Sequence, residues 1–409
     1  MLKPPATTLP PAFKHIAWSN LFAQFSEQIA LAAAPLAAVL LLSAGPAESG
    51  WLQMAQTLPF LLLSIPAGLL VDRASRRMLM VFSEMLRALS LVATLLLIAS
   101  GMLTLPLLAI MGFVGAIGTV CYSVAAPALI PAIVPRTQLA DANRWLELAR
   151  SLAYSGGPAI GGAIIAWTGA SLAYVAATTL SLLAVVLLAG LREQEQAAGP
   201  QRNLLDDLIE GARFLAGHAL LRPILVSAVV FNTSWFVLQA VYVAYAVRTL
   251  GLTATGVGVT LGIYGAGMMI GAYAAPTLAR RIPFGVMIAL GPLGGLLAAV
   301  VMLLTVWFPL GALAGVSFFL FGAGPILWSI ATLTLRQAIT PNAMLGRVSA
   351  FITTATFGAR PIGAALGALV ATHFGVKACL VVAATGFLIQ FLVIIASQVP
   401  RLQGLPEPA

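Results

Sequence analysis

The stretch GLLVDRASRR, residues 68–77, concentrates four charged side chains in a chain that otherwise has very few. Charged residues make up 8% of the 409 residues, whereas hydrophobic residues make up 60%. A soluble protein carries roughly a quarter charged residues, so this chain lacks the polar surface that a soluble globular protein needs. The composition predicts an integral membrane protein, in which the basic end of the stretch marks a membrane boundary.

Apolar segments of membrane-spanning length lie on both sides of this stretch and recur along the whole chain. A transmembrane helix needs about 20 predominantly apolar residues. Twelve segments meet this requirement: residues 15–42, 51–71, 78–100, 105–131, 141–167, 171–191, 222–247, 255–279, 284–307, 310–335, 343–371 and 376–397. The sequence therefore predicts an all-α integral membrane protein with twelve transmembrane helices.

One connection between the predicted spans is long and polar, and it divides the chain in two. Residues 192–221 contain the flexible sequence AAGP and the segment LLDDLIEGARFL (204–215), in which apolar residues recur with helical spacing and charges lie opposite. This pattern is typical of a short helix on a membrane surface. We predict an N-terminal six-helix half at 1–191, a cytoplasmic linker with a short amphipathic helix at 192–221, and a C-terminal six-helix half at 222–409.

Basic residues are distributed unequally between the two sides of the predicted bundle. Of the 21 Lys and Arg residues, Arg87, Arg150 and Arg360 lie within predicted helices, Arg248 and Lys377 lie on one side, and the other sixteen lie on the opposite side. Lys and Arg accumulate in the cytoplasmic loops of membrane proteins. We expect a multi-pass protein of the cytoplasmic (inner) membrane with both termini in the cytoplasm.

The two halves carry signs of an internal repeat. Gly68 and Gly271, which each begin a stretch ending in two arginines, are 203 residues apart, and so are Pro158 in GGPAIGG and Pro361 in ARPIGAALG. Two matches at one offset favour duplicated halves, which we expect to be pseudo-symmetric. Such repeats occur in transporters whose substrate site lies near the membrane midplane between the repeats.

Small residues and prolines in these matched segments have a structural interpretation. Gly157 and Gly161 have the small-xxx-small spacing that lets membrane helices pack closely. Pro158 and Pro361 are each expected to kink a helix.

Several motifs resemble one known family. GLLVDRASRR resembles the loop motif of the major facilitator superfamily: a glycine, an acid four residues later and spaced basic residues. WSNLFAQFSEQIALAAAPL (18–36) resembles the first helix of its drug- and siderophore-exporting branch, which includes enterobactin exporter-like and macrolide efflux-like proteins. PAIVPRTQLADANRWLELARSLAYSGGPAIGG (131–162) and RQAITPNAMLGRVSAFITT (336–354) resemble the entries to that branch's fifth and eleventh helices.

The resemblance implies the major facilitator fold and a function. It implies a secondary active transporter, specifically a proton-coupled exporter of amphipathic organic molecules, such as drugs or siderophore-like metabolites, that works by alternating access. A lipid or lysophospholipid transporter of the same fold stays open as the alternative. One departure from the family pattern is Ala275, which stands where the second-half copy of the loop motif would have its acid.

The first-half loop motif also implies a conformational latch. Its members are Gly68, Asp72, Arg73, Arg76 and Arg77. In the superfamily the acid of this motif meets the start of the eleventh helix, so Asp72 is expected to bind there. The sequence TPNAMLGRV predicts that this helix begins at Thr340 as its N-cap, with Pro341 at the first helical position. The alternative is that the basic residues only anchor the loop at the membrane and that Asp72 is a solvated turn residue.

Polar residues within the predicted spans are costly and therefore point to function. They recur on one face of the first helix and on one face of the seventh, which suggests two walls of a common cavity, although hydrogen bonds between helices would explain the amides equally well. The candidate substrate-binding residues are Asn20, Gln24, Phe25, Asn232, Trp235, Gln239, Tyr242 and Arg360. Arg360 lies deep in its helix, where it would pair with an acid, bind an anionic substrate or hydrate a cavity.

Two carboxylates are candidates for proton coupling. Glu27 lies about twelve residues into the first helix, which at 1.5 Å per residue places it roughly 18 Å deep. A carboxylate at that depth must be protonated or paired, so Glu27 is the first candidate for the proton carrier. Glu84 is the second. The alternative for Glu84 is a local ion pair with Arg87 three residues later.

Other features exclude whole classes of function. The chain has no P-loop lysine, no GxSxG and no HExxH sequence, so it offers no constellation for an enzyme. Cys121 and Cys379 lie in apolar segments and are expected to be buried. We expect no cofactor, no metal and no nucleic acid; the expected partners are a small-molecule substrate, protons as coupling ion and membrane lipids, with the chain acting as a monomer.

Overall fold

The computed structural model describes residues 10–73, 75–135, 138–191, 204–341 and 344–406. Every regular element in these ranges is helical, as the apolar segments predict. The helices are α1 (Pro11–Leu41), α2 (Pro46–Arg73), α3 (Arg76–Ala99), α4 (Leu105–Ile133), α5 (Leu139–Thr168), α6 (Ala170–Ala189), α7 (Leu204–Gly217), α8 (Leu221–Arg248), α9 (Ala254–Ala279), α10 (Phe284–Leu304), α11 (Gly311–Ile339), α12 (Leu345–Ile395) and the short 3-10 helix η2 (Val399–Arg401).

Helix α12 contains two of the twelve predicted spans. Gly375 interrupts it with φ 78°, a left-handed backbone conformation that glycine adopts without steric cost. The chain reverses direction at this glycine, within the break predicted between residues 371 and 376. Among the described residues, nine helices are long and apolar enough to cross a membrane, with α12 counted once. Helices α2 and α5 fall short of this apolarity in their described residues and are not among the nine. The nine helices, the second part of α12, and α2 and α5 together make twelve spans.

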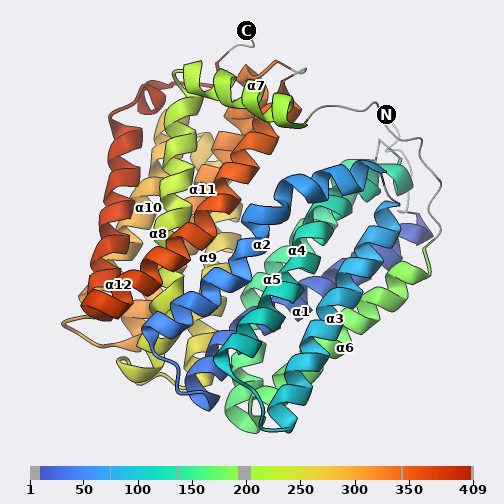
Figure 1. Ribbon diagram of the computed structural model, residues 1–409. Coiled ribbons are helices and arrows are strands. Elements are labelled where there is room, and N and C mark those ends of the chain that lie inside the picture. Colours follow the sequence, from blue (N-terminus) through green and yellow to red (C-terminus); the bar gives the residue numbers. More distant parts are fainter. Residues whose placement is uncertain (1–9, 74, 136–137, 192–203, 342–343, 407–409) are drawn as a thin grey trace.

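The helices form two groups that stand side by side. Helices α1–α6 form one group and α8–α12 the other, and the groups meet where α2 packs against α12 and α5 against α9. Figure 1 shows that the described residues begin and end at the same end of the bundle, which we call the terminal face; the other end is the opposite face. Helix α7 lies across the terminal face above the second group (Figure 1), where the amphipathic segment of the linker was expected.

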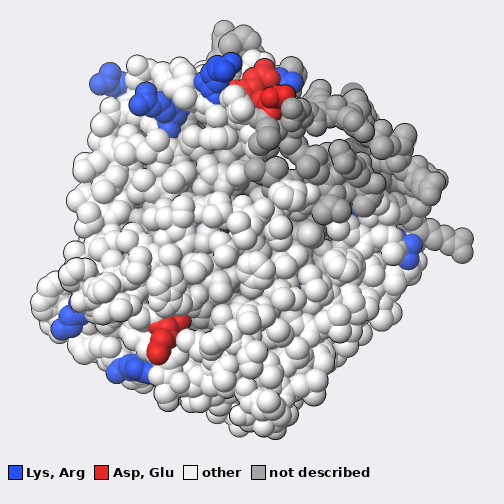
Figure 2. Space-filling model, in the orientation of Figure 1, with Lys and Arg blue, Asp and Glu red and all other residues white. Residues whose placement is uncertain are grey.

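The outer surface of the bundle is apolar between its two faces. Large hydrophobic side chains in the middle of helices, such as those of Leu89, Leu182 and Leu297, are exposed. Figure 2 shows charged side chains at the two ends and an uncharged band between them. An apolar surface of this extent is unfavourable in water and suits the hydrocarbon core of a bilayer.

The two halves contact each other through small residues on two equivalent pairs of helices. A Cβ atom at Gly50 of α2 would lie 2.8 Å from the backbone of Ala368 in α12, and one at Gly162 of α5 would lie 2.9 Å from Cα of Gly258 in α9. Such close approach of backbones requires residues without bulky side chains. Residues 139–168 of α5 correspond to the first part of α12 at the 203-residue offset, so the two interfaces follow from the sequence repeat.

The glycines and prolines singled out in the sequence lie at helix contacts. A Cβ atom at Gly157 would lie 2.5 Å from the side chain of Gln28, and one at Gly161 would lie 3.5 Å from Ile29, so both glycines pack α5 against α1. Pro158 and Pro361 lie buried within α5 and α12.

Candidate transport site

A cavity of about 370 Å³ lies between the two halves. Its walls come from α1–α6 on one side and from α8, α9, α11 and α12 on the other. The lining combines aromatic rings with a few polar groups, a composition that suits small organic ligands. The polar lining residues include Glu27, Gln28, Gln56, Arg87, Asn232, Gln239 and Arg360.

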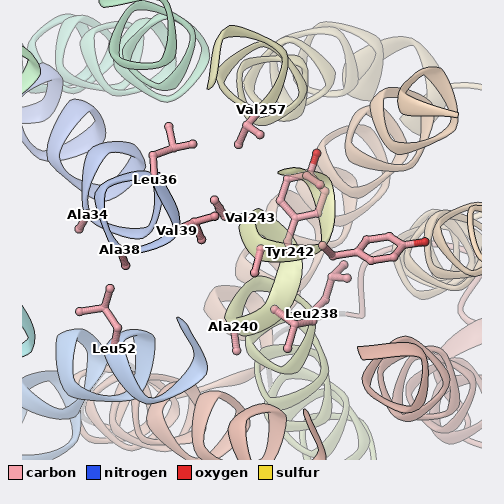
Figure 3. Close-up of a cluster of buried hydrophobic side chains, with 14 of the residues drawn as sticks. Ala34, Leu36, Ala38, Val39, Leu52, Leu238, Ala240, Tyr242, Val243 and Val257 are labelled. Atoms are coloured by element: carbon pink, nitrogen blue, oxygen red, sulfur yellow. The ribbon is translucent and has the colours of Figure 1, made fainter. Parts of the chain in front are cut away.

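Apolar side chains close the space between this cavity and the opposite face. Leu36 and Val39 lie near the end of α1, and they pack with Val243 of α8 and Val257 of α9 in one buried cluster. Figure 3 shows these side chains between the helices of the two halves, together with Leu52 of α2. The halves are therefore joined on the side of the opposite face.

A hydrogen-bonded arginine adds to this closure. The Nη2 atom of Arg248, the last residue of α8, donates to the carbonyl oxygens of Ser43 and Ala44, the latter at 2.8 Å. These carbonyls follow the C-terminal end of α1, where a positive charge is favourable. The contact ties the two halves together at the opposite face.

Three charged side chains of the first half form a buried cluster beside the cavity. Arg87 Nη1 lies 2.6 Å from Glu84 Oε1, and Arg87 Nη2 lies 3.6 Å from Glu27 Oε2. Ser181 donates a hydrogen bond of 2.9 Å to Glu84 Oε2, and the Glu84 side chain is completely buried. The Glu27 side chain keeps 19% exposure and lines the cavity, so Glu27 is the carboxylate of the cluster that a ligand or proton reaches.

The local pair predicted for Glu84 and Arg87 is thus present, but it is part of a larger arrangement. Sequence spacing identified the pair at three residues apart and missed that Arg87 also reaches Glu27 on another helix. Arg87 donates in addition to Thr119 Oγ1 of α4 at 2.9 Å. The only signal for this role in the sequence is the rarity of charge within the spans.

Arg360 of α12 faces the cavity from the second half. Its guanidinium carbon lies 4.1 Å from the ring centre of Phe357, 5.2 Å from that of Phe60 and 5.6 Å from that of Phe236. Of the three roles proposed for Arg360, pairing with an acid is not realised among the described residues, because no carboxylate there lies within ion-pair distance. Arg360 also borders a second, smaller cavity of about 200 Å³.

Half of the predicted substrate-binding residues line the cavity. These are Asn232, Trp235, Gln239 and Arg360. Trp235 stacks against Tyr264 with ring centres 5.2 Å apart, so the aromatic wall extends from α8 onto α9.

The other four candidates for the substrate site lie outside this cavity. Asn20, Gln24, Phe25 and Tyr242 do not line the cavity. Asn20 accepts a hydrogen bond of 3.5 Å from Tyr122 of α4, and the Phe25 ring lies against Gly156 of α5. Tyr242 is completely buried and bonded to Thr260. Helical periodicity identified the face of α1 and of α8 that carries polar residues. It did not show at which positions along that face neighbouring helices cover the side chains.

Polar residues of the second span line the cavity and were missed. Gln53, Gln56 and Thr57 lie on one face of α2, and Gln28 follows Glu27 on α1. The spacing of three and four residues between these polar groups in an apolar span is the signal that would have found them.

The loop motif lies at the terminal face, and only part of it is described. Arg77 Nε donates to the Leu188 carbonyl at 3.1 Å, and Arg77 also donates to the Ala189 carbonyl, so it binds the end of α6. Arg76 begins α3. The surroundings of Gly68 and the side chains of Asp72 and Arg73 are not among the described parts of the structure, and neither is any contact of Asp72.

The predicted start of the eleventh helix is wrong. Thr340 follows the end of α11, and α12 begins at Leu345 after Met344. A proline at position 341 favoured an earlier start, but the first described helical turn lies four residues later. In that turn Arg347 Nη1 lies 2.6 Å from Glu210 Oε2 of α7.

Comparison with known proteins places the chain in a family. The family described as "Transmembrane secretion effector", within the major facilitator superfamily, matches residues 7–407. The chain belongs to this family. It is therefore a multi-pass membrane transporter of the major facilitator superfamily and not an enzyme.

Individual relatives cover this transporter to different extents. The "Enterobactin exporter EntS" of Escherichia coli O1:K1 is 30% identical over 258 residues, which is 62% of this chain and 59% of the exporter. The alignment thus spans less than two thirds of the exporter's length. The "Uncharacterized MFS-type transporter y4rN" of Sinorhizobium fredii is 26% identical over 344 residues, 80% of this chain and 81% of that protein.

Solved structures share the fold of this transporter. A bacterial homologue of the iron transporter ferroportin in an inward-facing state has a TM-score of 0.75 at 16% identity and covers 94% of this chain and 98% of its own. A bacterial homologue of the lysosomal transporter Spinster has a TM-score of 0.72 at 14% identity, with 96% and 97% covered. The predicted fold of twelve helices in two pseudo-symmetric halves is confirmed.

Proposed function

We propose that the protein is a proton-coupled exporter of amphipathic organic molecules that works by alternating access. The observation that carries this proposal is the position of Glu27: it is the exposed member of a buried charge cluster and it lines the cavity between the halves. A group that binds protons and a space that holds substrate thus adjoin each other.

The charges in the cluster favour Glu27 over Glu84 as the proton carrier. Two carboxylates share one guanidinium, so one negative charge is in excess when both are ionised. Glu84 is the closer partner of Arg87, at 2.6 Å against 3.6 Å, and it also accepts from Ser181. Protonation of Glu27 leaves Arg87 fully paired with Glu84 and makes the cluster neutral, which favours its burial when the cavity closes.

The closed opposite face supports one half of an alternating-access cycle. In this state the apolar cluster and Arg248 join the halves at the opposite face, and the glycine contacts extend that junction toward the middle. We propose that the terminal face is the cytoplasmic one, because most basic residues were expected there. The state would then load substrate from the cytoplasm, and export requires the opposite contacts to open.

The lining of the cavity favours amphipathic molecules. Trp235, Tyr264 and Phe318 offer apolar rings, and Gln56 and Gln239 offer hydrogen bonds. The relationship to the enterobactin exporter makes siderophore-like metabolites the first substrates to test.

The proposal is tested by transport into proteoliposomes with an imposed pH gradient. A panel of lipophilic drugs, siderophores and lysophospholipids is offered to the wild type, Glu27→Gln and Glu147→Gln. Glu147 is the matched control, because it is a carboxylate in an exposed ion pair with Arg150 on α5. We expect the wild type and Glu147→Gln to accumulate substrate, and Glu27→Gln to bind it without accumulating it.

Two results would contradict this assignment. Uphill accumulation by Glu27→Gln would remove Glu27 as the proton carrier. If only the lysophospholipids of the panel are transported, the function is that of a lipid transporter of the same fold and not that of an exporter of drugs or siderophores.

A further inference from the structure

The charges that border the cavity form two poles of opposite sign, one in each half. Glu27 and Glu84 share Arg87, so the pole in the first half carries one excess negative charge when both carboxylates are ionised. Arg360 forms the positive pole in the second half. Glu27 and Arg360 line the same cavity from opposite halves.

Arg360 is held in position by aromatic rings, and no carboxylate of the described residues lies within ion-pair distance of it. Rings from α2, α8 and α12 surround its guanidinium, with centres 4.1–5.6 Å away. Within the described part of the chain, its buried Nε atom has no hydrogen-bond partner, and neither has Oε1 of Gln390, which shares the second cavity with Arg360. A cation in such surroundings is costly unless an anion or acceptor joins it, so the site is incomplete without a ligand.

We infer that the substrate is a dipolar amphipathic molecule: an acidic group binds Arg360, a cationic or hydrogen-bond-donating group binds Glu27, and an apolar body lies between them against Trp235 and Tyr264. This inference rests on the proposed transport function and adds the charge pattern of the substrate. A molecule of this kind contacts both halves at once, through α1 on one side and α12 on the other.

The two poles give the coupling a physical basis. A cationic group and a proton compete for the same carboxylate at Glu27, because either one neutralises the excess negative charge. Binding of the substrate therefore displaces the proton, and protonation from the other side of the membrane releases the substrate. The bond between the substrate's acidic group and Arg360 keeps the substrate oriented in the cavity. This acidic group does not take part in the exchange with the proton.

Binding of three dansyl compounds with one apolar body tests the inference. Nα-dansyl-lysine has a carboxylate and an ammonium group, dansylcadaverine has only the ammonium group, and dansylaminocaproate has only the carboxylate. Fluorescence titrations use the full chain in lipid nanodiscs, with empty nanodiscs as background. The variants are Glu27→Gln and Arg360→Gln, with Arg360→Lys as the variant that keeps the positive charge.

We expect the wild type to bind dansyl-lysine about tenfold more tightly than either singly charged compound, the magnitude of one hydrogen bond to a charged group. Arg360→Gln should bind dansyl-lysine only as well as dansylcadaverine, and Glu27→Gln only as well as dansylaminocaproate. Arg360→Lys should keep the preference. Equal affinities for the three compounds in the wild type, or equal losses for all three in either variant, would overturn the inference.

The failure of the inference and the failure of the proposed function give different results. Proton-driven uptake of all three compounds without preference would retain the function and reject the dipolar substrate. The predicted pattern of affinities without any proton-driven uptake would retain the site and reject the function. A competition experiment distinguishes a lipid substrate from a water-soluble one. Lysophosphatidylethanolamine also has a dipolar headgroup, and if it displaces dansyl-lysine, the substrate is a lipid.

Discussion

Replacement of Arg248 by alanine should loosen the opposite face of the transporter. Arg248 lies at the end of α8 and donates to the carbonyls of Ser43 and Ala44 beyond α1, so it links the two halves. These hydrogen bonds exist only while the opposite face is closed. Their loss therefore raises the free energy of the closed state without affecting the open one.

The magnitude follows from the strength and exposure of the contact. A hydrogen bond to a charged group contributes about 1.5–3 kcal/mol when it is buried. Arg248 is exposed, and water and salt weaken such contacts. We expect a net loss of about 1–2 kcal/mol, which changes the ratio of closed to open molecules by about 5- to 30-fold.

Distances between spin labels at Thr104 and Leu310 measure this ratio. Both residues are exposed at the opposite face, one in each half, and the two native cysteines are replaced by alanine in the labelled protein. Lys377→Ala is the control, because it removes an exposed positive charge from the same face. Arg248→Ala should enlarge the long-distance population while Lys377→Ala leaves it unchanged. Identical distance distributions for Arg248→Ala and the wild type would refute the role of this contact.

Three further predictions concern the cavity, the interface and the loop motif. Trp235→Ala removes the stacked ring of the aromatic wall and should weaken the binding of aromatic substrates by about tenfold; unchanged titration curves across several substrates would show that the ring is not a contact. Gly258→Leu places a side chain against the backbone of Pro158, so label distances should show the opposite face held open, whereas wild-type distances would mean that the interface yields. Asp72→Asn should lower turnover while substrate affinity at the terminal face is kept, if the latch exists; wild-type turnover in a flux assay would favour simple anchoring.

The arrangement of the helices follows closely from local properties of the sequence. Each apolar segment has to satisfy its backbone hydrogen bonds within itself in a membrane, so length and apolarity alone locate the spans. Gly375 separates the last two spans because its backbone conformation is open to glycine. The start of α12 was harder to predict, since a proline at position 341 fits either side of a helix boundary.

The sequence identified a site residue only where the residue type itself is unusual within a membrane span. Glu27 and Arg360 stand out because charge within a span is rare, and both line the cavity. The contact between Glu27 and Arg87 was not predictable, since it depends on how α1 and α3 are rotated and at what depth they cross. Tyr242 illustrates the same limit: it lies two turns beyond Trp235 on α8, where α9 covers it with Thr260.

In the proposed mechanism substrate and proton exchange at Glu27, and proton flux through the transporter tests this exchange. Proteoliposomes with a pH gradient and a pH-sensitive dye inside receive a transported substrate from outside. We expect substrate to collapse the gradient in the wild type and in Glu147→Gln. Glu27→Gln should bind the substrate but show only the proton leak of protein-free liposomes. Substrate-dependent proton flux at the wild-type rate in Glu27→Gln would contradict the claim.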